Sequence, residues 1–338
     1  TLGIWLDKNL EKNASEINAA LDILEQNRNI RAVFVGNEAL FREDVRIDQL
    51  IGYLDEVRAM THVPVATAEP WHIWIKHPEL APHVDLIAAH VLPFWQQEIK
   101  DEQAISFVLE TAKRLRQQFG KKPLVLAEVG WPSHGRALNG SDSSRIEQAV
   151  FLRTLVNELN AKGYKYFVIE AFDQPWKVND EGDVGAYWGV FDVERAEKFP
   201  LSGPVIKIPK WRALAAASVI LGIFALAIIL IDSSGLHQRG RTFLAVLAFI
   251  FASFLVFVAY DYSQQYLSWF EWMMGILLVL GASGVFIVLF TEAHELAESV
   301  WVSQRRRLFR PVTAENAYRP KVSIHVPCYN EPPEMVKQ

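Results

Sequence analysis

Hydrophobic and polar positions follow two different patterns along the chain. Up to about residue 200, short apolar runs alternate with longer segments in which apolar residues recur at helical spacing. From Trp211 to Phe290, apolar residues form three long runs that contain almost no charge. We therefore expect a globular domain followed by a region that is apolar throughout.

The first region predicts a parallel sheet covered by helices. Its short apolar runs are β-rich and hydrophobic at nearly every position, as strands buried on both faces are. The predicted strands are Leu2–Leu6, Ala32–Val35, Val63–Ala68, Val84–Ala89, Leu124–Ala127 and Tyr166–Ile169. Amphipathic patterns predict helices at Ala14–Gln26, Ile47–Met60, Asp101–Phe119 and Ser144–Lys162. Repeated strand–helix units favour a parallel sheet.

The number of these units favours an α/β barrel. We expect residues 1–203 to form a partial (β/α)8 TIM barrel containing strands three to eight, with the first two units before Thr1. A barrel truncated in this way would have open sheet edges and low stability. The alternative is an open doubly wound sheet, but no glycine-rich phosphate loop follows any predicted strand.

The three apolar runs predict transmembrane helices within residues 211–290. Each has about the 20 residues that a helix needs to cross a bilayer. The runs are Trp211–Ile231, Thr242–Tyr260 and Trp272–Phe290. Tryptophans at their edges suit the membrane interface. Long buried helices of a soluble protein are the alternative, which the short linkers between the runs disfavour.

Basic residues predict the orientation of these helices. The arginines between the first two runs and after the third are Arg239, Arg241, Arg305, Arg306, Arg307 and Arg310. The positive-inside rule places them in the cytoplasm and residues 1–210 outside, although Lys207, Lys210 and Arg212 oppose this assignment. Residues 291–318 are expected to form a linker, either along the inner membrane surface or in solvent.

Charge and cysteine content exclude some classes of function. The formal net charge is −5 and no basic face is visible, so no nucleic-acid partner is expected. The single cysteine, Cys328, excludes an internal disulfide framework and a cysteine-rich metal site.

Carboxylates and aromatic residues collect after the predicted strands, where barrel enzymes carry their chemistry. Glu38 ends the second predicted strand and Glu128 ends the fifth. The candidate substrate-binding residues at the same strand ends are Asn37, Glu69, Trp71, His90, Phe94, Trp95, Trp131, Glu170, Asp173, Trp176 and Lys177. Aromatic rings stack on sugar faces and polar groups bind sugar hydroxyls, so the pattern predicts a sugar-binding cleft.

Glu38 and Glu128 together suit a retaining glycoside hydrolase. Such enzymes need a carboxylic acid and a nucleophilic carboxylate about 5–5.5 Å apart. Only closure of a barrel could bring together two residues so distant in sequence. Asn37 would then be placed to bond the 2-hydroxyl of the sugar. His90 could orient the nucleophile or be a structural histidine, and Trp131 could be a stacking platform or part of the core.

Three motifs carry a resemblance to a known family. Val35-Gly36-Asn37-Glu38 and residues 127–133, Ala-Glu-Val-Gly-Trp-Pro-Ser, resemble the two signature motifs of family 17 glycoside hydrolases, the β-1,3-glucanases. Residues 172–177 resemble the third motif, although Gln174 stands where a Glu is frequent, and Leu92-Pro93 stands where Tyr-Pro is frequent. The resemblance implies Glu38 as acid/base, Glu128 as nucleophile, a β-1,3-glucan substrate and no cofactor or metal. Some members of that family transfer the glycosyl unit to another sugar.

Residues 319–338 carry a second resemblance. Their apolar run ends in Pro327-Cys328-Tyr329-Asn330-Glu331, which resembles the first strand and nucleotide-sugar loop of family 2 glycosyltransferases; an unstructured tail is the alternative. A nucleotide sugar and a divalent metal would be needed only by transferase parts beyond Gln338. The whole arrangement resembles bacterial inner-membrane β-glucan synthases, with residues 1–210 periplasmic and 291–338 cytoplasmic.

The leading hypothesis is retaining hydrolysis or transglycosylation of β-1,3-glucan by a domain anchored in the lipid bilayer. The alternative is a catalytically silent barrel that binds glucan and guides a polymer made by a linked glycosyltransferase. A transporter or sensor is disfavoured, because the apolar runs contain no charge that would mark a substrate path.

Overall fold

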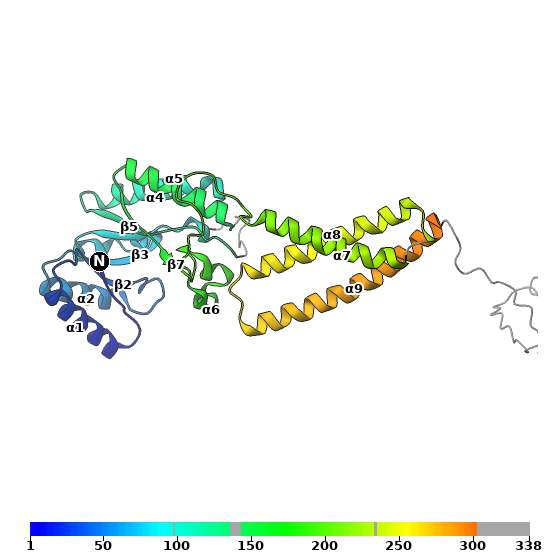
Figure 1. Ribbon diagram of the computed structural model, residues 1–338. Coiled ribbons are helices and arrows are strands. Elements are labelled where there is room, and N and C mark those ends of the chain that lie inside the picture. The colour runs from blue at the N-terminus through cyan, green and yellow to red at the C-terminus, as the bar shows by residue number, and fades with distance from the viewer. Residues whose placement is uncertain (97–98, 136–142, 233–234, 303–338) are drawn as a thin grey trace, which may run out of the picture. The chain divides into compact units, whose positions relative to one another are not determined.

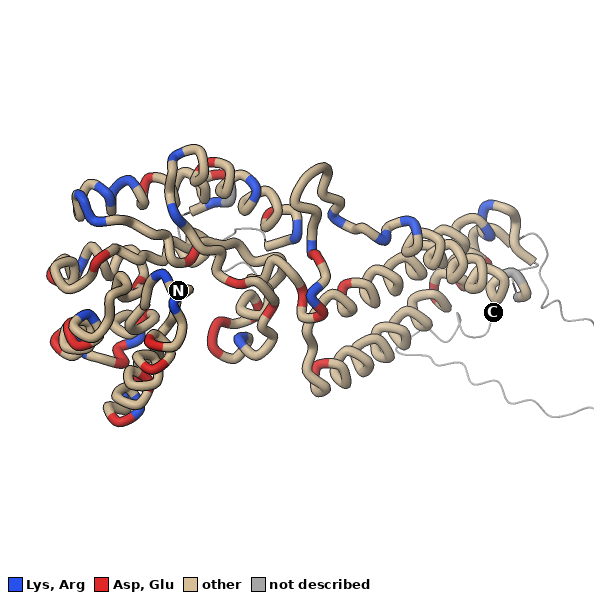
Figure 2. The backbone as a smooth tube through the Cα atoms, turned by 60° about the vertical axis from the view of Figure 1, so that its left-hand side comes forward, with Lys and Arg blue, Asp and Glu red and all other residues tan. Residues whose placement is uncertain are grey.

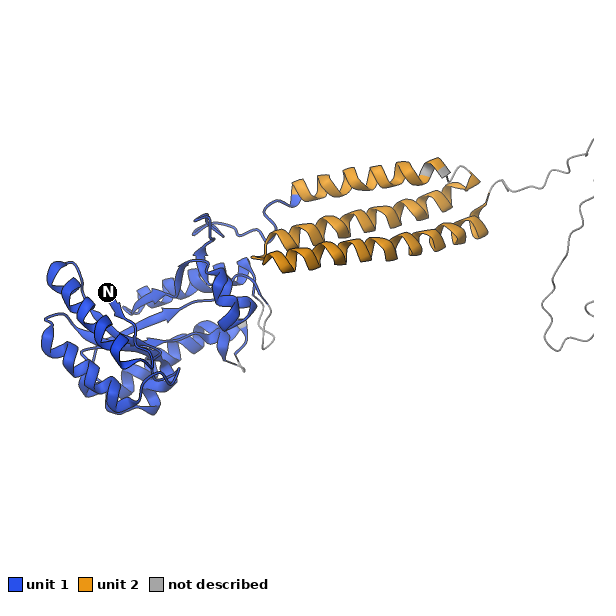
Figure 3. Ribbon diagram, turned by 90° about the horizontal axis from the view of Figure 1, so that it is seen from below, with its two compact units in different colours: residues 1–211 blue, residues 212–338 orange. Residues whose placement is uncertain are grey.

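The computed structural model describes residues 1–96, 99–135, 143–232 and 235–302. The chain divides into two units, Thr1–Trp211 and Arg212–Gln338 (Figure 3). The predicted glycosyltransferase start at 319–338 and the arginines from Arg305 to Arg310 lie outside the described residues.

Unit 1 is built on a sheet of six strands in sequential order (Figure 1). Every neighbouring pair is parallel. The strands are β1 Leu2–Ile4, β2 Val33–Asn37, β3 Val65–Pro70, β4 Ile87–His90, β5 Leu124–Val129 and β6 Lys165–Val168. Sequential order among parallel strands is the order of a barrel and not of a doubly wound sheet.

The sheet is curled. Phe34 on β2 and Phe167 on β6 have ring centroids 6.4 Å apart. In a flat sheet, four strand spacings would separate these residues by about 19 Å. Their contact therefore requires the two strands to face each other across the concave side. The predicted partial barrel is confirmed as a curled six-stranded parallel sheet, in which β1 and β6 are the edges among the described residues.

Helices cover the outer face of this sheet. They are α1 Leu10–Gln26, α2 Ile47–Met60, α3 Trp71–Lys76, α4 Asp101–Phe119 and α5 Arg145–Ala161, whereas the short α6 Val178–Glu181 packs against the 3-10 segments on either side of it. The side chains of Leu50 and Leu54 on α2 are fully buried against Val33 and Val35 of β2. The predicted bounds of α2 and α4 are confirmed to the residue. Short 3-10 helices lie at Pro78–His83, Pro93–Trp95, Pro175–Lys177 and Asp183–Tyr187.

A second, two-stranded parallel sheet was not predicted. It pairs β7, Glu170–Phe172, with β8, Gly189–Phe191. Gly189 is required at this pairing, because a Cβ there would lie 2.3 Å from the backbone of Phe172 and Asp173. The small sheet brings the segment after β6 back beside the sheet end that carries Glu128, since Ser133 N donates to Tyr187 O at 3.0 Å.

Unit 2 consists of three long helices among its described residues: α7 Trp211–Asp232, α8 Gln238–Ser263 and α9 Trp269–Trp301. Each is long and apolar enough to cross a membrane. Large apolar side chains such as Ile231, at 80% exposure, and Ile287, at 66%, cover their outer surfaces. Charged residues lie near the helix ends, whereas in unit 1 they are spread along the chain (Figure 2).

The predicted bounds of two of these helices were too short. α8 extends beyond Thr242–Tyr260 at both ends and α9 extends beyond Trp272–Phe290. The prediction ended where polar residues begin, but backbone hydrogen bonding continues into the polar ends. Residues 291–301, assigned to the linker, therefore continue α9 as one helix. The rest of that linker, from residue 303, lies outside the described residues.

Candidate active site

Four titratable side chains from four neighbouring strands meet at the carboxyl end of the sheet. Glu38 follows β2, Glu69 lies on β3, His90 ends β4 and Glu128 lies on β5. The strand register pairs His90 with Glu128 directly. Because the strands are parallel and in sequential order, these four residues lie side by side at the carboxyl end of the sheet.

The backbone of Glu38 adopts a left-handed conformation, with φ of 56°. Such a conformation is costly for a residue other than glycine and persists only where its surroundings enforce it. Here, Glu38 N donates to Ala68 O at 2.7 Å, and Glu38 O accepts from Arg42 N at 2.8 Å. Two positions earlier, Gly36 has φ of 81°. The strand therefore turns sharply at its end and presents the Glu38 side chain to the neighbouring strands.

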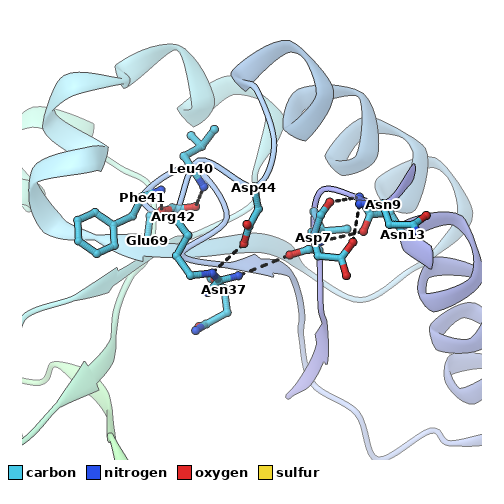
Figure 4. Close-up of polar contacts among 10 residues, drawn as sticks. Asp7, Asn9, Asn13, Asn37, Leu40, Phe41, Arg42, Asp44 and Glu69 are labelled. Atoms are coloured by element: carbon cyan, nitrogen blue, oxygen red, sulfur yellow. Dashed lines mark hydrogen bonds and ion pairs between the residues drawn. The ribbon is translucent and has the colours of Figure 1, made fainter. Parts of the chain in front are cut away.

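The Glu69 side chain hydrogen-bonds to the backbone of the loop that follows Glu38 (Figure 4). Its carboxylate is fully buried and accepts from Leu40 N at 2.9 Å and Phe41 N at 3.2 Å. Arg42 fixes the other side of the loop through Asn37 O, at 2.5 Å, and Asp44. Glu69 was expected to line the cleft. The structure corrects this, because its buried oxygens bind the backbone that carries Glu38.

His90 lies between the two glutamates. Its Nδ1 is 2.9 Å from Glu38 Oε1 and 3.5 Å from Glu128 Oε2. The imidazole is almost fully buried, whereas the Glu38 and Glu128 side chains are about a quarter exposed, at 25% and 23%. One ring nitrogen thus contacts both carboxylates, and both carboxylate side chains stay partly exposed.

Burial and neighbouring charges shift the pKa values at this site. Desolvation raises the pKa of Glu128 to about 7, against the lowering effect of His90. Desolvation likewise raises the pKa of Glu69 to about 7, in spite of its two backbone hydrogen bonds. Burial alone would lower the pKa of His90, but the hydrogen bond to Glu38 and the charges of Glu128, Glu38 and Glu69 raise it above its ordinary value. The cluster can therefore hold protons near neutral pH.

The distances fit a retaining pair of carboxylates. One oxygen of Glu38, one of Glu128 and a ring nitrogen of His90 all lie within 4.8 Å of one another. Retaining glycosidases place their carboxyl groups about 5–5.5 Å apart, whereas inverting enzymes need about 6.5–9.5 Å. Such a trio could also surround a cation, but Nδ1 of His90 is already engaged by Glu38. We assign it as a hydrogen-bonded cluster.

The other predicted cleft residues separate into two groups. Asn37, Trp71, Trp95, Trp176 and Lys177 are partly or largely exposed, with Trp176 at 67%.

Phe94 and Trp131 belong to the second group. The prediction of Phe94 as a substrate-binding residue needs a correction, and of the two alternatives for Trp131 the structure favours the core. They are only 2% and 1% exposed, and their rings pack at 5.3 Å from each other in the core. Neither ring presents a free face to a sugar.

Glu170 and Asp173 are also buried, and each pairs with a lysine. Lys177 Nζ contacts Glu170 Oε1, and it also lowers the pKa of Glu128. Asp173 Oδ1 accepts from Lys198 Nζ at 2.7 Å and from Gly189 N at 2.9 Å. Lys198 was not predicted, because a lone lysine beyond the last strand gives no pattern. These contacts tie the small sheet to the segment that follows it.

Sequence reasoning also missed an exposed aromatic residue beside Glu38. Phe41 is 50% exposed, and its backbone N–H is held by Glu69. Its ring packs edge-on against the exposed imidazole of His72, with centroids 5.6 Å apart, and His72 in turn contacts Trp71. An aromatic residue three positions after Glu38 was the available signal. The group forms a wall next to the acidic cluster.

Comparisons with known proteins agree with this geometry. Residues 1–189 match the model of the BtgE/BtgC glycoside hydrolase domain. A glucan 1,3-beta-glucosidase from Schizosaccharomyces pombe is 27% identical over 51% of the chain, and a probable glucan endo-1,3-beta-glucosidase btgC from Aspergillus flavus is 30% identical over 64%. The aligned parts cover 58% and 35% of those proteins, so the chain spans less than two thirds of either relative.

A solved structure gives the same picture for the fold. An active-site mutant of Rhizomucor miehei beta-1,3-glucanosyltransferase, in complex with laminaritriose, aligns with a TM-score of 0.52 and 25% identity. The alignment covers 57% of this chain and 71% of that one. The likeness supports the assignment of unit 1 as a partial barrel.

Proposed function

The chain belongs to the BtgE/BtgC glycoside hydrolase family, and from this premise we propose that unit 1 cleaves or transfers β-1,3-linked glucan with retention of configuration. The observation that carries this proposal is the contact of one buried histidine with two partly exposed glutamates at retaining spacing. The β-1,3 linkage is proposed from the relatives, whose names refer to 1,3-β-glucan, and from the structural neighbour that holds laminaritriose.

The proposed reaction has two steps. In the first, a Glu128 oxygen forms a bond to the anomeric carbon, the glycosidic bond breaks, and Glu38 gives its proton to the leaving oxygen. In the second, Glu38 takes a proton from water or from a sugar hydroxyl, whose oxygen attacks the anomeric carbon and releases Glu128. Water gives hydrolysis and a sugar gives transglycosylation. Asn37, next to Glu38, is proposed to bind the 2-hydroxyl of the sugar.

Residues around the cluster are proposed to hold the glucan. Trp71, Trp95 and Trp176 offer ring surface for sugar faces, and Lys177 offers a cation beside Glu128. No metal or cofactor is needed for the two steps, since the carboxylates supply the proton, the nucleophile and the base.

Product analysis tests the proposal. The full chain in detergent micelles is incubated with laminarihexaose, and the products are resolved by mass and linkage. We expect shorter β-1,3 oligosaccharides, or longer ones if transfer dominates, and no products with Glu128→Ala. Binding of the oligosaccharide without turnover by the wild type would favour the silent glucan-binding barrel instead.

For unit 2, we propose insertion into the inner membrane of a bacterium, with residues 1–210 periplasmic and 291–338 cytoplasmic. The support is three long apolar helices and the arginine distribution of the sequence. We further propose that the chain acts with a family 2 glycosyltransferase that begins at residues 319–338 and uses a nucleotide sugar and a divalent metal. Cysteine labelling from the periplasmic side tests the orientation: a cysteine introduced at Ser202 should react and Cys328 should not.

A further inference from the structure

Nδ1 of His90 faces two carboxylates that exchange roles during a retaining reaction. The nitrogen is 2.9 Å from Glu38 Oε1 and 3.5 Å from Glu128 Oε2. Nε2 is buried and has no hydrogen-bond partner among the described residues, so Nδ1 makes the polar contacts of this ring. With a hydrogen on Nδ1, the nitrogen donates to Glu38 Oε1 and faces Glu128 Oε2.

The groups around His90 favour its charged form. Glu38 approaches from the end of β2, Glu69 from β3 and Glu128 from the adjacent position on β5. All three are acidic, and each raises the pKa of His90. Of the basic groups around the cluster, Lys177 pairs with Glu170 and acts on Glu128, and His72 acts on Glu38. A positive charge on the imidazole therefore offsets a local excess of negative charge.

We propose that His90 is a positioning residue that stays positively charged and serves as counter-ion to both glutamates in turn. The inference rests on the proposed function. Before attack, Glu38 holds a proton and Glu128 is the anion beside His90. When Glu128 becomes the neutral glycosyl ester, the proton of Glu38 has passed to the leaving oxygen and Glu38 is the anion. The negative charge has moved from one side of Nδ1 to the other, while the total charge of the three side chains is unchanged.

This arrangement explains how one fixed group serves both steps. A cation held next to Glu128 alone would stabilise that carboxylate as an anion and oppose its conversion to the neutral ester, without stabilising the charge that builds up on Glu38. His90 contacts both carboxylates without moving, because strand pairing fixes it opposite Glu128 and the left-handed turn brings Glu38 to it. Preorganised charge of this kind needs no rearrangement during the reaction.

The test separates the charge of His90 from its hydrogen bond. In His90→Asn, the amide nitrogen can replace Nδ1 as donor but carries no charge; His90→Phe removes both. The matched control is His83→Asn, since His83 Nδ1 lies 2.9 Å from Asp55 Oδ1 of α2, and neither residue belongs to the cluster. The readout is the pH profile of kcat/KM on laminarihexaose, measured with the full chain in micelles.

We expect both limbs of the His90→Asn profile to move to higher pH by about 1–3 units, as loss of a cation close to two carboxylates predicts. His83→Asn should keep the wild-type limbs. A His90→Asn profile that falls at every pH with unmoved limbs would reduce His90 to a structural role and overturn the proposal.

A second measurement does not depend on turnover. Histidine-selective ¹⁵N NMR of the wild type, with the His90 signal identified by its loss in His90→Asn, reports the charge of the ring directly. We expect an imidazolium at pH 7 in the wild type. In Glu38→Gln, the ring should lose its proton at a lower pH than in the wild type. A neutral His90 at pH 7 would overturn the proposal even if the wild type cleaves laminarihexaose. A charged His90 in a protein without turnover would instead contradict the proposed function alone.

Discussion

Two clusters in unit 1 pair carboxylates with a cation, and they differ in how fully the charges are satisfied. In the first, a single His90 nitrogen is shared by Glu38 and Glu128, whose side chains are about a quarter exposed. In the second, Asp173 and Lys198 are 1% and 3% exposed, and each has a further backbone partner, Gly189 N and Tyr187 O respectively.

The difference indicates what each cluster is for. The buried carboxylate of Asp173 accepts hydrogen bonds from Lys198 Nζ and Gly189 N. Lys198 thereby connects the segment after β7 to the segment after β8. Glu38 and Glu128 share one ring nitrogen of His90 and are partly exposed, so both carboxyl groups remain accessible to a substrate. The first cluster therefore predicts losses of activity when altered, and the second predicts losses of stability.

The largest expected effect is on catalysis. Glu128→Ala should lower kcat on laminarihexaose by about 10⁴-fold or more, as removal of one member of a catalytic unit does. Its melting temperature should not fall, because the substitution removes a desolvated carboxylate. The control is Glu158→Ala, which alters an exposed glutamate of α5. Retention of more than a tenth of the activity by Glu128→Ala would contradict the assignment of the first cluster to catalysis.

The second effect is on stability. Lys198→Met leaves the buried Asp173 carboxylate without its cation and should cost about 3–5 kcal/mol in the free energy of unfolding. Thermal melts of the full chain, followed by tryptophan fluorescence, measure the loss. The double variant Asp173→Asn/Lys198→Met should regain part of it. If Lys198→Met melted like the wild type but lost turnover, the lysine would belong to the active site instead.

The third expected effect is a pH dependence of stability that comes from Glu128 in the first cluster. The pKa of Glu128 is raised from 4.5 to about 7, so the folded state favours the neutral form. Its contribution to stability is complete below pH 4.5 and is lost as the pH rises through about 7. Glu128→Gln is always neutral and should be more stable than the wild type at pH 8, by about 1–3 kcal/mol. Near pH 4 the two should melt alike, and a pH-independent difference would contradict the raised pKa.

The smallest expected effect is the loss of an exposed ion pair, which serves as a reference for the loss of the buried pair. Lys162 and Glu158 form an exposed i,i+4 pair on the surface of unit 1, with side chains 48% and 42% exposed. Lys162→Met should change the free energy of unfolding by less than about 0.5 kcal/mol. The same substitution, lysine to methionine, is thereby compared at a buried and at an exposed carboxylate. Equal losses at both positions would remove the distinction between them.

The fold was predictable wherever one local rule dominated. Ile47–Met60 and Asp101–Phe119 were predicted to the residue, because apolar residues at helical spacing end there together with the helix. β7 and β8, of three residues each, were missed. The helix ends at Gln238 and Trp301 were missed because polar residues there continue the backbone hydrogen bonding without the apolar pattern.

Strand-end position and motif likeness selected Glu38 and Glu128, and the structure brings both to the same imidazole. Their catalytic roles stay a prediction, and their surroundings were less predictable. Sequence could not tell that Phe94 and Trp131 are buried or that Glu69 binds backbone, since burial depends on how distant segments pack. The contact of His90 with both glutamates depends on register and on the positive φ of Glu38, which no local pattern reveals.

Trapping of the covalent intermediate directly tests whether Glu128 is the nucleophile of a retaining reaction. The full chain is incubated with a 2-deoxy-2-fluoro β-laminaribiosyl fluoride, which forms the glycosyl-enzyme quickly and releases it slowly, and the digested protein is analysed by mass spectrometry. The account predicts one added laminaribiosyl unit on the peptide that contains Glu128, and none in Glu128→Ala. An adduct on Glu38 or Glu170, or turnover of laminarihexaose without any adduct, would contradict it.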